Sequence, residues 1–199
     1  MHLEVESTRQ SKCPKCGMDL VLKADLVHET TMYHGAGVNL KNYLPLFVII
    51  GLILLSSIAI SIRDLQLGGW NLSQSVSYFM IGFFLVFSGF KLIDLKGFAQ
   101  GYSTYDLLAK KWFGYGYIYP FIELAFGLSM ILIPHSVALM ILEILVMGFS
   151  GIGVAIKIAK KEKFQCACLG TFLKVPLTKV TLIEDFGMAT LAFMLLILK

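Results

Sequence analysis

Charged residues are scarce in this sequence. Only 15% of its 199 residues are Asp, Glu, Lys or Arg, whereas 57% are hydrophobic and the mean hydropathy is +0.76. A chain of this length could bury a core as one soluble domain, but so few polar side chains could not cover a globule. The sequence therefore predicts an integral membrane protein in contact with the lipid bilayer. The modest net charge of +4 gives no indication of nucleic-acid binding.

Motifs of several enzyme classes are missing as well. The sequence has no phosphate-binding loop, no serine or cysteine hydrolase motif and no zincin helix, so whether it is an enzyme stays open. About the first forty residues are polar and lack the apolar stretch of a cleavable signal peptide, so the sequence predicts none. The four cysteines form two close pairs rather than a secreted disulfide framework. Such pairs in a membrane or intracellular protein indicate metal binding or redox chemistry.

Long apolar segments dominate what is present. About five of them approach the roughly 20 residues that a helix needs to cross a bilayer core. They predict an all-α membrane domain over 44–199, with helices at about 44–62, 76–95, 117–133, 137–156 and 180–198. A small arm at 1–24 and a linker at 25–43 precede this domain. The last helix carries Glu184 and Asp185 near its start, so its uncharged part begins only at Phe186.

The lysines are distributed unevenly across the predicted membrane. With five spans, one side has only Arg63 and Lys199. The other side has Lys23, Lys41, Lys96, Lys110, Lys111, Lys157, Lys160, Lys161, Lys163, Lys174 and Lys179. We expect a bacterial inner-membrane protein, and the positive-inside rule then predicts a cytoplasmic amino terminus. Both cysteine pairs would lie on the cytoplasmic side.

The first cysteine pair lies in the arm, in the stretch SKCPKCGMDL. Cys13 and Cys16 can bring two sulfur atoms together, either as half of a tetrahedral thiolate site or as a closable disulfide. Met18 and His2 are further candidate ligands. Zinc would require four ligands, whereas Cu(I) accepts thiolate and thioether. This mixture favours Cu(I), with zinc as another thiophilic ion that the arm could take.

The arm resembles the heavy-metal-binding module of copper-exporting ATPases and metal-efflux adaptors. The resemblance covers MHLEVESTRQSKCPKCGMDL, against a module that reads roughly CPMHPEV, a spacer and KCPKCGMDL. It implies metal binding by Cys13 and Cys16, with Met18 or His2 assisting. This sequence lacks the leading Cys-Pro and has Leu3 in place of the module's proline. The alternative is an arm that has lost its metal-binding role.

The membrane domain resembles the MauE/DoxX family over about residues 76–199. The resemblance rests on FSGFKLIDLKGFAQGYSTYDLLAK, YPFIELAFGL and KFQCACLGTF in this order. It implies a four-helix membrane bundle associated with thiol redox or with the maturation of partner proteins. The segment at 44–62 would then be an additional helix. A thioredoxin-like or a metal-efflux protein is the expected kind of partner.

The second cysteine pair follows the fourth apolar segment. In extended backbone, Cys166 and Cys168 would point to the same face. They could bind one soft ion or close a small strained disulfide, which exchanges readily. The lysines that precede the pair favour the reactive thiolate form. The alternative is a pair of small, inert, buried thiols.

Besides Glu184 and Asp185, four charged residues lie within the apolar segments. Lys91 and Asp94 are three residues apart, so one helix face could pair them. Lys91 could also reach Glu123 in the next segment, and Glu143 lies in the middle of the fourth. Ionised groups are costly in hydrocarbon, so each should face the bundle and find a partner or a proton. A structural ion pair and a transport or proton-relay role are both open.

Aromatic residues gather between the second and third segments and at the start of the third. They are Tyr102, Tyr105, Trp112, Tyr115, Tyr117 and Tyr119. We interpret them as an interfacial aromatic belt, with a quinone site among them as the alternative.

These patterns give one leading hypothesis and two alternatives. The leading hypothesis is a membrane protein that handles a soft metal and thiol redox state together. Its CPKC arm would capture the ion, and Cys166 and Cys168 would receive it or exchange disulfides. One alternative is a thiol–disulfide oxidoreductase that passes electrons to a quinone. The other is a non-catalytic membrane partner in the maturation of a redox or metal-efflux system.

Overall fold

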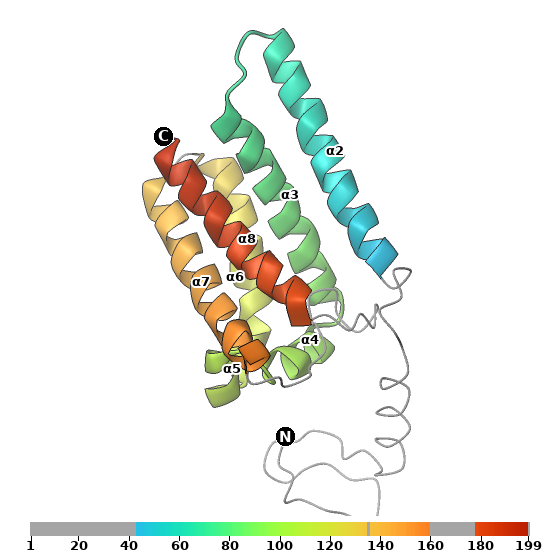
Figure 1. The fold of residues 1–199 in the computed structure, drawn as a ribbon, viewed down its shortest axis with the longest axis vertical. Helices are drawn as coiled ribbons and strands as arrows, with labels where there is room; N and C mark the ends of the chain where they lie inside the picture. The colour runs from blue at the N-terminus through green and yellow to red at the C-terminus, as the bar shows by residue number, and fades with distance from the viewer. Residues whose placement is uncertain (1–42, 135, 160–177, 199) are drawn as a thin grey trace, which may run out of the picture. The chain divides into compact units, whose positions relative to one another are not determined.

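The described part of the chain is helical. The computed structural model describes residues 43–134, 136–159 and 178–198, and the regular secondary structure in these ranges is entirely α-helix with one short 3-10 start (Figure 1). These ranges belong to one compact unit, Asn42–Lys199. The helices are α2 (Leu44–Gln66), α3 (Leu72–Ile93), α4 (Leu95–Tyr102), α5 (Leu107–Lys111), α6 (Gly114–Leu132), α7 (Val137–Ala159) and α8 (Thr178–Ile197). The prediction of an all-α protein is confirmed.

Four helices have the length and hydropathy of membrane spans. They are α2, α3, α6 and α7, of which α7 qualifies over Val137–Ile156. The first four predicted segments coincide with these helices to within a few residues at each end, so the prediction of a multi-pass membrane protein is confirmed. The fifth predicted segment forms α8. That α8 crosses the bilayer stays a prediction. The cytoplasmic position of the amino terminus stays a prediction as well.

The connection between α2 and α3 follows from the local sequence. Gly68 has a φ of 75°, in the left-handed region that favours glycine. Its N–H donates to the Leu65 carbonyl at 3.1 Å, and the Gly69 N–H donates to the Asp64 carbonyl at 3.0 Å. This pair of bonds closes the carboxyl end of a helix. The Asn71 side chain then caps the first turn of α3.

The helices pack in two main pairs. α7 packs extensively on α8, and α3 packs on α6 and, less extensively, on α2. Phenylalanine and methionine side chains from α3, α6, α7 and α8 fill the core between them. Many large apolar side chains stay exposed on the outward faces, as on α2 at Leu55 and Leu65. An outward face of this kind is stable in contact with lipid rather than water.

Two short helices, α4 and α5, were not predicted. They lie at one end of the bundle, between α3 and α6 (Figure 1). Asp94 caps α4 by accepting a hydrogen bond from the Gly97 N–H at 2.9 Å. α4 is amphipathic, and its Phe98 and Ala99 are buried. α4 therefore covers this end of the bundle, and it contacts α6 closely.

We expect Gly116→Ala to destabilise the protein, because α6 approaches α4 closely at this residue. A Cβ atom at Gly116 would lie 3.1 Å from the Ala99 Cα and 3.2 Å from its carbonyl oxygen. Backbone atoms cannot move aside cheaply, so overpacking should cost about 1–3 kcal/mol. Gly89→Ala is the matched control, because its Cβ would meet nothing within 4 Å and alanine favours a helix by about 1 kcal/mol over glycine. Thermal unfolding in detergent should move in opposite directions for the two variants, and equal shifts would contradict the close approach.

Candidate functional site

A buried lysine joins three helices. Lys91 lies in the last turn of α3, with its side chain almost fully buried. Its Nζ donates to Glu123 Oε1 and Oε2 on α6, at 2.5 and 2.7 Å, and to Glu184 Oε1 on α8 at 3.1 Å. The structure therefore contains the Lys91–Glu123 contact that the sequence suggested, and it adds Glu184. Two carboxylates around one ammonium offset the cost of burying these charges.

A third carboxyl group belongs to the same cluster. Asp185 follows Glu184 on α8, and both line a cavity of about 10 Å³ together with Lys91. This volume is close to that of one water position. Among the described residues, Glu184 Oε2 and Asp185 Oδ2 have no hydrogen-bond partner. Lys91, Glu123, Glu184 and Asp185 are called the polar cluster from here on.

Aromatic rings enclose the polar cluster. The Lys91 Nζ lies 5.6 Å from the centre of the Phe98 ring and 5.5 Å from that of Tyr119. Tyr119 stacks on Phe98 and on Tyr102, with ring centres 6.2 and 4.6 Å apart. Cation–π contacts stabilise the ammonium, and an apolar wall strengthens every electrostatic contact inside it. The site is therefore rigid and dry apart from its small cavity.

The prediction of an aromatic belt is wrong for three of its members. Tyr102 and Tyr105 are each 2% exposed and Tyr119 is 1% exposed, so all three belong to the core. The reason is that α4 folds across the end of the bundle and that Tyr119 faces inward on α6. Burial raises the pKa of Tyr102 and Tyr105 well above the ordinary value, so both phenols stay protonated. Trp112, at 61% exposure, fits an interfacial position.

Hydrogen bonds lead from the cavity towards α5. The Ser150 hydroxyl on α7, which lines the cavity, lies 3.2 Å from the Tyr102 hydroxyl. The Tyr102 hydroxyl donates to Asp106 Oδ2 at 3.0 Å. Asp106 Oδ1 accepts from the Leu108 and Ala109 N–H groups at 2.9 and 2.8 Å, which caps α5. Cavity, tyrosine and helix cap therefore form one connected network.

We expect Asp106→Ala to destabilise the protein more than Asp106→Asn. Asp106 is fully buried, and alanine would leave the two α5 N–H groups and the Tyr102 hydroxyl without an acceptor. Buried groups that lose their partner cost about 1–3 kcal/mol. Asparagine keeps a carbonyl oxygen for the cap, and its amide can donate to Tyr102. Thermal unfolding of both variants in detergent checks this, and equal losses would show that the acceptor is not the stabilising feature.

The other two predicted intramembrane residues are Asp94 and Glu143. Asp94 is partly buried and caps α4. Glu143 lies in the middle of α7, is 1% exposed, and neither of its carboxyl oxygens has a partner among the described residues. An ionised carboxylate without a partner is costly in such surroundings, so we expect this carboxyl group to hold a proton.

Glu184 and Asp185 were noted in the sequence but not predicted as part of the site. Their position near the start of an apolar segment shortens the uncharged part of the fifth predicted helix. The same position, two adjacent carboxylates in an apolar helix, is itself a signal for an intramembrane polar site. What the sequence could not show is that α8 brings them to Lys91.

All the predicted metal ligands and redox cysteines lie outside the described residues. This applies to Cys13, Cys16, Met18 and His2 in the arm, and to Cys166 and Cys168, so their roles stay predictions. Within the described ranges, no group of three or more His, Cys, Asp and Glu residues is placed to hold a metal ion. The chain between Ala159 and Thr178 joins α7 to α8, and both of these helix ends lie at the end of the bundle with α4 and α5 (Figure 1).

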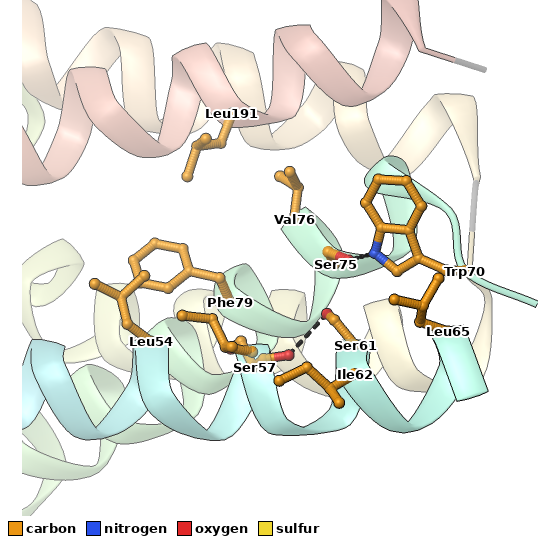
Figure 2. A pocket seen from close by; sticks show the side chains of 11 residues that line it. Leu54, Ser57, Ser61, Ile62, Leu65, Trp70, Ser75, Val76, Phe79 and Leu191 are labelled. Atoms are coloured by element: carbon orange, nitrogen blue, oxygen red, sulfur yellow. Dashed lines mark hydrogen bonds between the residues drawn. The ribbon is translucent and has the colours of Figure 1, made fainter. Parts of the chain in front are cut away.

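An apolar groove of about 600 Å³ lies on the other half of the bundle, lined by residues of α2, α3 and α8 (Figure 2). Its serine hydroxyls are used internally. Ser57 and Ser61 donate to carbonyls of α2 at 2.8 Å, and Ser75 accepts from the Trp70 indole at 3.1 Å. The groove therefore suits hydrocarbon rather than a polar ligand.

Comparison with protein families gives one match. The family model described as methylamine utilisation protein MauE matches residues 69–198, more than half of the chain. The match covers α3 to α8 and leaves α2 and the arm outside. It agrees with the resemblance that the sequence motifs indicated over about 76–199. Comparison with curated proteins and with solved structures gives no match.

Proposed function

Because the chain belongs to the MauE family of membrane proteins, we propose that it sets the thiol redox state of a partner protein during maturation, together with a soft metal ion. Cys166 and Cys168 carry the thiol chemistry. The CPKC arm, with Cys13 and Cys16, captures the ion and passes it to them. The family description names methylamine utilisation, so the partner would be a redox protein that needs disulfides or a metal.

The proposed reaction is dithiol–disulfide exchange. One thiolate of the Cys166/Cys168 pair attacks a disulfide of the partner, forms a mixed disulfide and releases a partner thiolate, which takes up a proton. The second cysteine loses its proton, attacks the mixed disulfide and releases the other partner thiol. The pair is oxidised by two electrons and the partner is reduced by two. The reverse sequence oxidises the partner.

The observation that supports this proposal is where the chain leaves and re-enters the bundle. Cys166 and Cys168 lie in the sequence between α7 and α8, and the described end of α7 and start of α8 are both at the α4–α5 end of the bundle (Figure 1). This end also contains the hydrogen-bonded network through Tyr102 and Asp106. In the proposed exchange one proton leaves the second cysteine and one is taken up by the released partner thiolate, and hydroxyl groups can both accept and donate protons in such transfers.

Reaction with glutathione disulfide tests the thiol part. We use Cys13→Ser/Cys16→Ser protein, so that only the second pair can react. This variant should release both glutathione thiols for each disulfide reduced and should form a Cys166–Cys168 disulfide. The protein with all four cysteines replaced is the control and should release none. An unreactive Cys166/Cys168 pair would contradict the proposal.

Metal titration tests the arm. Wild-type protein should bind Cu(I), and Cys13→Ser/Cys16→Ser should lose the share of that binding that belongs to the arm, because two serines cannot replace two thiolates for a soft ion. Replacing Cys166 and Cys168 by serine should leave the arm loaded but block transfer to the second pair. Full metal stoichiometry in the Cys13→Ser/Cys16→Ser protein would exclude the arm as the site.

The groove does not favour coupling to a quinone. Its Trp70 end lies beside Ser75, in the first turn of α3, whereas Lys91 lies in the last. Sixteen residues of helix separate the two by about 24 Å. A head group at the Trp70 end of the groove would therefore lie far from the α4–α5 end of the bundle. Quinone-dependent turnover by the purified protein would favour the oxidoreductase alternative, and silence in the thiol and metal assays would favour a non-catalytic partner.

A further inference from the structure

We propose that the polar cluster is a proton-binding site, and that Ser150, Tyr102 and Asp106 connect it to the α4–α5 end of the bundle. The proposal goes beyond the thiol function and rests only on described residues. Its failure would leave the proposed function of Cys166 and Cys168 untouched.

The charges of the polar cluster do not balance. Lys91 provides one positive charge, whereas Glu123, Glu184 and Asp185 provide three negative charges if all are ionised. Two uncompensated negative charges would then lie in a dry interior. Because the cost of an unpaired buried carboxylate is several kcal/mol, neutralisation by protons is the cheaper arrangement.

Among the residues whose side chains the structure describes, the surroundings provide no other cation for the excess charge. The titratable and charged groups that face the cluster are Lys91 from α3, Tyr119 and Glu123 from α6, Tyr102 from α4, Tyr105 from the α4–α5 connection, and Glu184 and Asp185 from α8. Of these described groups only Lys91 is a cation, and its Nζ already contacts two carboxylates. α7 contributes Ser150, which is not titratable.

The cluster also has specific atoms for a proton. Glu184 Oε2 and Asp185 Oδ2 lie at the cavity without a hydrogen-bond partner among the described residues. The cavity, at about 10 Å³, is at the lower limit for one water molecule and far too small for an organic ligand. A proton shared between these carboxyl groups, directly or through one water, satisfies atoms that otherwise stay unpaired.

The connection to the end of the bundle follows the hydrogen bonds. Ser150 and Tyr102 both line the cavity and lie 3.2 Å apart, and Tyr102 donates to Asp106 at 3.0 Å. Each hydroxyl can accept a proton on one side and release one on the other. No bond other than O–H bonds is made or broken, so the transfer needs no redox partner.

Infrared difference spectroscopy of the purified full-length protein in lipid nanodiscs tests the site. All samples carry Glu143→Gln, which removes the other unpaired buried carboxyl group. At neutral pH we expect a protonated-carboxyl band that is lost as the pH is raised. Glu184→Gln or Asp185→Asn should weaken or remove this band. Asp64→Asn is the control and should keep it, because Asp64 lies in α2 and accepts from the Tyr78 hydroxyl.

An unchanged band in both cluster variants would overturn the proton site, and so would its absence at neutral pH. The same spectra test the connection. In deuterated buffer, Tyr102→Phe should slow hydrogen–deuterium exchange of the band, whereas Tyr117→Phe should exchange at the parent rate. Equal rates for these two variants would overturn the path through Tyr102. Thermal unfolding of each variant shows whether it is folded, and the isosteric Glu184→Gln and Asp185→Asn changes provide two independent tests.

Discussion

Lys91→Met is expected to destabilise the protein by about 3–5 kcal/mol, the usual cost of removing one partner from a buried ion pair. Methionine fills much of the lysine's volume, so packing changes little. The loss comes from Glu123 and Glu184, whose oxygens now contact the Lys91 Nζ at 2.5 to 3.1 Å and would stay buried without a cation. Thermal unfolding in detergent measures it.

The control for this variant removes the charges on both sides. In Lys91→Met/Glu123→Gln/Glu184→Gln protein, no charge of the ion pair stays buried, so most of the lost stability should return. Replacing all partners of a buried ion pair by uncharged side chains often changes the stability of a protein little. If the triple variant is as unstable as Lys91→Met, then the cost lies in lost packing and not in the unpaired carboxylates.

Tyr119→Ala is expected to have a similarly large effect, about 3–5 kcal/mol, as for other large-to-small changes of buried aromatic residues. The Tyr119 ring is 1% exposed and packs on Phe98 and Tyr102 from α4. It also lies over the Lys91 ammonium. Alanine would leave a cavity beside the polar cluster and admit water to it. The loss should appear as a lower unfolding temperature in detergent.

Tyr119→Phe separates the ring from its hydroxyl. The hydroxyl donates to the Met147 sulfur, at 3.5 Å, and a thioether is a weak acceptor. Phenylalanine keeps the ring contacts, so its cost should stay below about 1 kcal/mol. A Tyr119→Phe protein as unstable as Tyr119→Ala would mean that the hydroxyl, rather than the ring, holds α4 in place.

The membrane helices could be predicted because hydrocarbon imposes a simple requirement on sequence. A helix of spanning length needs an uninterrupted apolar run, and α2, α3, α6 and α7 each contain one. The ends were less predictable. α3 starts at Leu72 and not near Val76, because Asn71 supplies a polar cap in a stretch that also contains three serines. Hydropathy values carry no information about the residue that caps a helix.

The polar cluster was only half predictable. Lys91 and Glu123 are charged residues within apolar segments, and a lysine side chain is long enough to predict a contact between them. Glu184 and Asp185 are equally visible in the sequence, but only the packing of α8 brings them to Lys91. Helix-to-helix placement depends on side-chain packing over the whole bundle, which one sequence does not disclose.

For the aromatic residues, the sequence predicted an interfacial position for side chains that the structure buries. Tyrosines near the ends of spans indicate an interface, and Trp112 obeys that pattern. Tyr102 and Tyr105 do not, because α4 and the connection after it cover the end of the bundle and bury them. The Tyr102 hydroxyl finds partners inside, in Asp106 and Ser150, as buried tyrosines generally must. The clue in the sequence is Asp106, a capping residue that marks a second short helix after Tyr105.

Trapping of a mixed disulfide tests the proposed function most directly. Native membranes are treated with acid to quench exchange, thiols are alkylated, and proteins are separated without reductant. Cys166→Ser or Cys168→Ser protein lacks the resolving thiol, so the remaining cysteine should accumulate a covalent adduct with the partner that reductant removes. The double variant should show none. If neither single variant forms a reducible adduct, the pair does not exchange disulfides with a partner, and the thiol function proposed for this MauE-family protein is wrong.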